Sequence, residues 1–94
     1  MIRHRLTLTN KRGLHARASA KFVKLVAGFD ADVWVEREGM RVTGTSIMGL
    51  MLLAAAYGDS IEVSVQGRDA AAALKAIEEL LARKFDEEDG DSTH

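Results

Sequence analysis

A histidine stands at the point where a loop changes into a helical pattern. Residues 13–17 read Gly-Leu-His-Ala-Arg, and helical periodicity runs from Ala16 to Ala27. A helix start presents free backbone N–H groups and the positive end of the helix dipole, which together favour an anion such as phosphate. Neutral imidazole can attack phosphorus, and Arg17 can hold two phosphate oxygens at once. His15 and Arg17 therefore predict a site of phosphoryl transfer.

Two less specific interpretations of these residues stay open. A lone histidine more often caps or packs against a helix start than carries chemistry. Arg17, Lys21 and Lys24 recur at i, i+4 and i+7, which is typical of an ordinary solvated helix face. Beside an anion site, the same stripe would steer acidic partner surfaces, so we take Lys21 and Lys24 as candidate docking residues.

Ser46 is the second residue suited to chemistry. It directly precedes the apolar run 47–53, where its hydroxyl would cap a helix. A phosphate on Ser46 would suit the helix dipole and would add about −1.5 to −2 charges next to Ile47, Met48 and Met51. The run is too uniformly apolar for a surface helix of a monomer, so we expect part of it to be exposed for partner docking.

The periodicity of the chain predicts the elements that carry these residues. They are a strand over 2–9, a helix over 16–27, strands over 32–36 and 40–43, a short helix over 47–56, a strand over 60–66 and a helix from Ala70 through Leu81. This β-α-β-β-α-β-α order favours an α+β fold, with one mostly antiparallel sheet covered by helices on its apolar face.

Turn and cap residues mark where these elements end. Gly28 is expected to end the first helix in a left-handed conformation, and Glu38-Gly39 to form a hairpin turn. Asp69 is expected to cap the last helix. Because acidic residues near a helix C-terminus oppose its dipole, residues 1–85 are predicted to form a single domain and 86–94 an acidic, disordered tail.

Composition restricts the class of protein. The 94 residues carry a net charge of −1 and contain no cysteine, which suits the cytoplasm and argues against a general nucleic-acid binder. A nucleic-acid module would also need stacking aromatics, of which only Trp34 is plausible on a strand. No apolar run is long enough to span a bilayer. No nucleotide-binding loop or metal-ligand cluster occurs, so no cofactor or metal is expected.

Two motifs together resemble a known family. Gly13–Arg17 followed by the helix 18–27, with Ser46-Ile47-Met48-Gly49-Leu50-Met51 further on, is similar to HPr, the histidine-containing phosphocarrier of the bacterial phosphoenolpyruvate-dependent phosphotransferase system. The resemblance covers about residues 1–85. It implies an open-faced β-sandwich of four antiparallel strands and three helices.

The resemblance also implies roles for individual residues. His15 would take a phosphoryl group on Nδ1 from phosphorylated Enzyme I, with help from Arg17, and EIIA-type domains would receive it. Ser46 matches the serine phosphorylated by HPr kinase/phosphorylase in bacteria that have that enzyme, and Ile47, Met48 and Met51 match a docking surface. Two residues depart from the family pattern: Ala18 replaces a common proline, and Arg12 adds charge close to His15.

The leading functional hypothesis is therefore a monomeric phosphoryl carrier, which acts as a co-substrate of partner phosphotransferases and is not itself an enzyme. The alternative is a regulatory docking module controlled mainly through Ser46. The sequence leaves open which EIIA protein is served, and so whether the pathway concerns sugar uptake or nitrogen.

Overall fold

Four strands form a single antiparallel sheet in the order β1-β4-β2-β3. The computed structural model describes residues 1–87, and the strands are β1 (Ile2–Thr7), β2 (Asp32–Arg37), β3 (Met40–Thr43) and β4 (Ser60–Gln66). Central strand β4 pairs Val63 with His4 of β1 on one side and with Val35 of β2 on the other. Strand β1 thus lies at an edge of the sheet, and its C-terminal end leads into the loop that carries His15.

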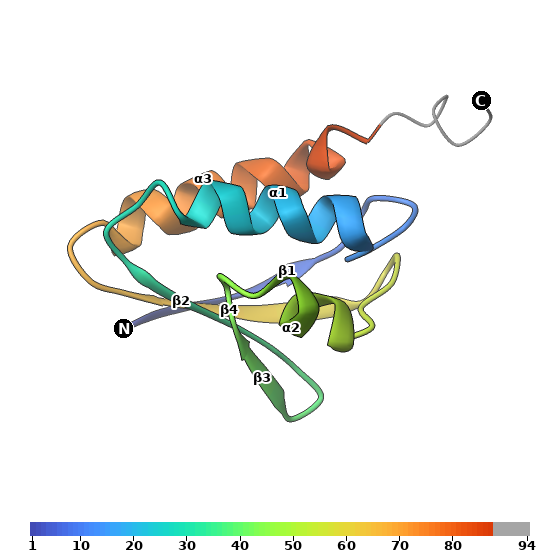
Figure 1. Ribbon diagram of the computed structural model, residues 1–94, viewed down its shortest axis with the longest axis horizontal. Coiled ribbons are helices and arrows are strands. Elements are labelled where there is room, and N and C mark those ends of the chain that lie inside the picture. Colours follow the sequence, from blue (N-terminus) through green and yellow to red (C-terminus); the bar gives the residue numbers. More distant parts are fainter. Residues whose placement is uncertain (88–94) are drawn as a thin grey trace.

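The helices cover one face of this sheet, as Figure 1 shows. They are α1 (Ala16–Val26), α2 (Ile47–Leu52) and α3 (Ala70–Ala82), followed by the short 3-10 helix η1 (Lys84–Asp86). Helix α1 packs between α2 and α3, while α3 also contacts β1 and β4. The predicted open-faced sandwich of four antiparallel strands and three helices is confirmed.

Alternating strand residues supply the core. Val33 and Val35 of β2, together with Val63 of β4, are at most 4% exposed, as their period of two predicts. Phe22 of α1 and Ile77 of α3 close over them and are completely buried. Each such side chain contributes about 1.5–3 kcal/mol when removed from water, so the face that carries the helices also carries most of the stability.

The opposite face of the sheet is open. Trp34, the one strand aromatic considered for base stacking, lies on this face with the guanidinium carbon of Arg41 4.8 Å from its ring centroid. An arginine at this distance makes a cation–π contact with the ring. Its own chain therefore already supplies Trp34 with a stacking partner.

Several predicted boundaries differ from the structure. The first strand ends at Thr7 rather than at residue 9, because the Leu8 N–H leaves the ladder and donates to the Asp59 carbonyl at 2.9 Å. The short helix ends at Leu52 rather than at residue 56, since Ala54 adopts a φ of +53°. Local hydrogen bonds outside the regular pattern therefore shorten both elements.

Two of the predicted caps are wrong in detail. Gly28 is not left-handed: its N–H donates to the Leu25 carbonyl at 3.1 Å, and Ala27 ends α1 in a right-handed conformation. Asp69 occupies the N-cap position of α3, but its carboxylate accepts the Asp30 N–H at 2.8 Å instead of capping the helix. The turn at Glu38-Gly39 is confirmed by φ angles of +49° and +84°.

The end of the domain lies further along the chain than residue 85. Phe85 is 2% exposed, Asp86 belongs to η1, and the Glu87 side chain is only 15% exposed. Burial of Phe85 draws the chain back against the domain, so Glu87 departs from the predicted solvated tail, whereas the Asp86 side chain is 55% exposed. The rest of that predicted tail, residues 88–94, lies outside the described residues.

Within residues 1–87, no helix combines the length and the apolar composition that crossing a bilayer requires.

Candidate functional site

The loop before α1 is held in place by backbone contacts. The Leu14 N–H donates to the Ala55 carbonyl at 2.9 Å, and the Asn10 side-chain amide donates to the Gly13 carbonyl at 2.8 Å. Gly13 has a φ of +59°, and a Cβ there would lie 2.3 Å from the Ala55 oxygen. Only glycine combines this conformation with so close an approach. The loop therefore presents the next residues in a fixed orientation.

His15 is the N-cap residue of α1, yet its side chain does not cap the helix. The first helical hydrogen bond runs from the Ser19 N–H to the His15 carbonyl at 2.9 Å. The N–H groups of residues 16–18 precede it and have no acceptor within the helix. The imidazole makes no capping bond to these groups, and its Nε2 lies 2.9 Å from Oε1 of Glu87.

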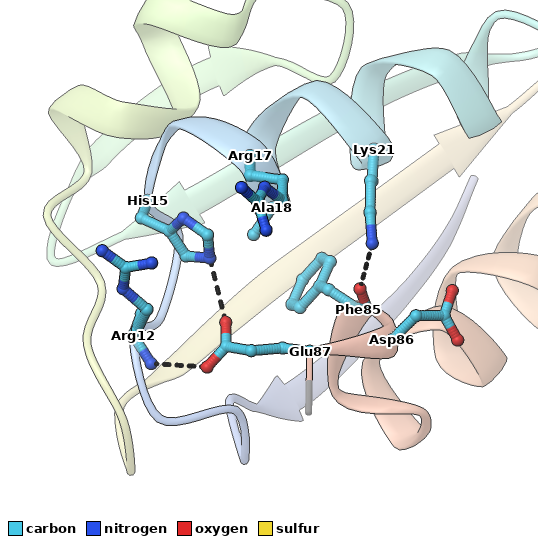
Figure 2. A pocket seen from close by; sticks show the side chains of 8 residues that line it. All are labelled: Arg12, His15, Arg17, Ala18, Lys21, Phe85, Asp86 and Glu87. Atoms are coloured by element: carbon cyan, nitrogen blue, oxygen red, sulfur yellow. Dashed lines mark hydrogen bonds and ion pairs between the residues drawn. The ribbon is translucent and has the colours of Figure 1, made fainter. Parts of the chain in front are cut away.

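A pocket of about 210 Å³ opens beside the imidazole (Figure 2). It is lined by residues from the loop, α1 and the C-terminal segment: Arg12, His15, Arg17, Ala18, Lys21, Phe85, Asp86 and Glu87. Arg12, Arg17 and Lys21 supply three cations, and the Lys21 ammonium donates to the Phe85 carbonyl at 2.7 Å. The pocket thus places a nucleophilic side chain, cationic groups and a helix start around one space.

Glu87 is held from three directions. One carboxylate oxygen accepts from the Asn10 amide at 3.2 Å and lies 2.9 Å from His15, and the other accepts the Arg12 N–H at 3.3 Å. Burial by itself would raise the pKa of this carboxyl, but the hydrogen bonds from Asn10, His15 and Arg12 and the charge of His15 bring the pKa below its ordinary value. Glu87 is therefore an anion at neutral pH.

The predicted second site lies on α2. The Ser46 hydroxyl accepts the Gly49 N–H at 2.9 Å, which confirms the predicted helix cap. Ile47, Met48 and Met51 point outward, and Met48 is 69% exposed, whereas Leu50 is buried in the core. This surface belongs to a helix packed against α1, but none of its residues lines the His15 pocket.

The structure thus brings some of the predicted site residues together and leaves others apart. His15, Arg17 and Lys21 share the pocket, while Lys24 lines a groove between α1 and α3. Glu87 also lines the pocket, although the sequence patterns place it in the tail, because a contact across 72 residues leaves no local sequence pattern. Asn10 carries no functional signal in the sequence, although its position three residues before Gly13 is compatible with the turn that its side chain stabilises.

This fold and this site together define a small carrier domain, in which a histidine at a helix start faces a cation-lined pocket. A family profile described as PTS HPr component phosphorylation site matches residues 2–83. The phosphocarrier protein HPr of Xylella fastidiosa strain Temecula1 is 44% identical over 88 residues, which are 94% of this chain and 99% of the relative. HPr of Neisseria meningitidis serogroup A is 46% identical over 87 residues, covering 93% and 98% of the two chains.

A solved structure gives the same result. The crystal structure of HPr-C-His from Thermoanaerobacter tengcongensis superposes with a TM-score of 0.89 at 39% identity, covering 94% of this chain and 99% of that one. The chain belongs to the HPr family, the phosphocarriers of the bacterial phosphotransferase system.

Proposed function

We propose that His15 accepts a phosphoryl group from phosphorylated Enzyme I and passes it to EIIA-type domains. The observation that carries this proposal is the position of the imidazole at the start of α1, beside a pocket lined by Arg12, Arg17 and Lys21. Membership of the HPr family implies phosphotransferase-system partners of this kind. The chain supplies the nucleophile and acts as a co-substrate, and its partners supply the remaining catalysis.

Nδ1 is the proposed phosphoryl acceptor. Nε2 of His15 is engaged with Glu87, and within residues 1–87 Nδ1 makes no hydrogen bond. The Nδ1 lone pair forms the new bond to phosphorus. At the same time the bond between phosphorus and the donor atom breaks, and the donor atom leaves with the electron pair of the broken bond. The Arg17 guanidinium and the free N–H groups at the start of α1 would then hold the phosphate oxygens. No cofactor or metal is needed for this exchange.

Labelling by phosphoenolpyruvate tests this function. The chain is incubated with Enzyme I and phosphoenolpyruvate, and acid-labile, base-stable phosphate is measured. We expect stoichiometric labelling of the wild type and none of His15→Ala. His4→Ala is the matched control, because His4 is an exposed histidine that pairs with Glu78 of α3 and does not line the His15 pocket. Equal labelling of His15→Ala, or no labelling of the wild type, would refute the proposal.

We further propose that phosphorylation of Ser46 regulates docking, through HPr kinase/phosphorylase in bacteria that have that enzyme. The specific observation in favour is that Ser46 caps α2 directly beside exposed Ile47 and Met48. A phosphate there would leave the helix start stable but would set a dianion at the edge of an apolar surface. Ile47, Met48 and Met51, with Lys21 and Lys24 of α1, would form the docking surface.

Binding measurements separate this regulatory role from the carrier role. Ser46→Asp keeps a capping side chain and adds a charge, so we expect weaker binding of Enzyme I, with labelling restored at higher Enzyme I concentration. Ser46→Asn, an uncharged capping residue, is the matched control and should bind like the wild type. Unchanged affinity of Ser46→Asp for Enzyme I, EIIA and the kinase alike would contradict the regulatory proposal.

We propose that the protein carries the phosphoryl group as a monomer in the cytoplasm.

A further inference from the structure

We propose that Glu87 is a positioning residue for phosphoryl transfer at His15. Its carboxylate accepts the Nε2–H, which fixes the orientation of the ring, leaves Nδ1 as the nitrogen that attacks phosphorus, and balances the positive charge that the ring gains on phosphorylation. This inference rests on the proposed function of His15. It assigns a role to the C-terminal segment, which the sequence patterns placed outside the domain.

The geometry makes Glu87 an anchored partner rather than a passing surface contact. His15 and Glu87 are 21% and 15% exposed at their side chains, and both carboxylate oxygens of Glu87 are engaged. Asn10, itself 1% exposed, donates both to Glu87 and to the Gly13 carbonyl. The Asn10 amide therefore links the loop that precedes His15 to the carboxylate that holds the His15 ring.

The backbone that delivers Glu87 is strained. Lys84, Phe85 and Asp86 have φ angles of +57°, +56° and +57°, and none of them is glycine. Side-chain-bearing residues rarely adopt this left-handed conformation, and where they do, the surrounding contacts impose it. Here those contacts are the buried Phe85 ring and the bond from Lys21 to the Phe85 carbonyl. The turn ends at Glu87, beside His15 (Figure 2).

The charge balance of the reaction explains why a carboxylate suits this place. A neutral imidazole that carries its proton on Nε2 attacks phosphorus through Nδ1 and becomes a phosphoimidazolium, while the bonding electron pair leaves with the donor. The proton stays on Nε2. Glu87, already an anion, then faces a positively charged ring, and the attraction disappears again when the phosphoryl group moves on. A hydrogen bond to a charged partner is stronger than one between neutral groups, so Glu87 favours the charged form of the ring.

The chain contains a matched control for this pair. The Nδ1 of His4 on β1 lies 2.8 Å from the Glu78 carboxylate of α3, in an exposed position. Neither His4 nor Glu78 lines the His15 pocket. Glu78→Gln and Glu87→Gln thus each remove one negative charge and one carboxylate partner of a histidine. Only Glu87→Gln changes the environment of the histidine ring that lines the pocket.

The experiment is rapid-quench phosphorylation of the full chain by phosphorylated Enzyme I, across a range of concentrations. We expect Glu87→Gln to slow the transfer at saturation about tenfold, the loss typical of one charge-assisted hydrogen bond, with the half-saturating concentration unchanged. Glu78→Gln should match the wild type. In ¹⁵N spectra, the Nε2–H signal of unphosphorylated His15 should shift in Glu87→Gln and stay in Glu78→Gln.

Each other outcome overturns the inference in a distinguishable way. A wild type that is not labelled removes the proposed function and this inference with it. A labelled wild type with Glu87→Gln transferring within twofold of it leaves the function standing and refutes the role of Glu87. Equal slowing by Glu78→Gln would show an effect of net charge, and a changed half-saturating concentration alone would show a docking role.

Discussion

Gly13→Ala should destabilise this protein far more than an ordinary glycine replacement. The residue has a φ of +59°, and a Cβ there would lie 2.3 Å from the Ala55 carbonyl oxygen and 2.7 Å from the Ala56 Cα. Both neighbours are backbone atoms, so no side chain can rotate away. The loop would have to move, and the Leu14 N–H bond to Ala55 would stretch with it.

The magnitude follows from two separable effects. The left-handed conformation costs a residue with a Cβ about 1–2 kcal/mol. Overpacking against atoms that cannot yield typically adds about 1–3 kcal/mol. The expected loss in the free energy of unfolding is therefore about 2–5 kcal/mol, a large share of the roughly 5–15 kcal/mol that holds a domain together.

Gly39→Ala provides the control. Gly39 has a φ of +84°, but a Cβ there would meet nothing within 4 Å. Gly39→Ala therefore carries the cost of the left-handed conformation without a steric overlap. The loss of chain entropy in the unfolded state is common to both variants. The difference between the variants isolates the contact with Ala55.

Urea unfolding followed by circular dichroism measures both variants. We expect Gly13→Ala to lie about 1–3 kcal/mol below Gly39→Ala, which corresponds to a difference in Tm of about 4–8 °C for each kcal/mol in a domain of this size. Equal stability of the two variants, within about 0.5 kcal/mol, would refute the argument that the His15 loop is pressed against residues 55 and 56.

Two further predictions concern the cap of α2 and the C-terminal carboxylate. Ser46→Ala removes the acceptor of the Gly49 N–H and should lower the free energy of unfolding by about 1 kcal/mol, whereas Ser46→Asp should lie close to the wild type in a thermal melt; equal losses in both would contradict the capping role. Because the folded-state pKa of Glu87 lies below its ordinary value, its contribution to stability is fully present above the unfolded-state pKa and is lost as pH falls through the folded-state pKa. The stability difference between the wild type and Glu87→Gln should therefore shrink as the pH falls from about 5 through the folded-state pKa of Glu87. A difference that keeps growing in this acid range would show the opposite sign.

The parts of the fold that follow from local periodicity could be predicted from the sequence. Strict alternation at 60–66 gives β4 with its bounds, and Val63 and Val65 lie inside as expected. Ser46 before an apolar run gives its cap. These features depend on contacts between residues close together in the chain, which a local pattern records.

The contacts that complete the site could not be predicted in this way. The acidic composition of residues 86–91 favours solvent, and nothing in it distinguishes Glu87 from its neighbours. Burial of Phe85 and a left-handed turn decide that Glu87 faces His15. The same holds for Asp69, where a bond to Asp30, 39 residues away, replaces the local cap. In both cases a tertiary partner outcompetes the local preference.

The bond from the Arg12 N–H to Glu87 connects the His15 loop to the C-terminal segment, and it makes amide hydrogen exchange a reporter of the site. If the segment detaches while the sheet stays folded, the Arg12 amide exchanges through this local opening. The Leu14 amide, which is hydrogen-bonded to Ala55, would exchange only through a larger opening of the fold. The protection of the Arg12 amide, relative to its rate in an unfolded chain, therefore measures how often His15 loses its carboxylate partner in the native protein, and the Leu14 amide is the reference for larger openings.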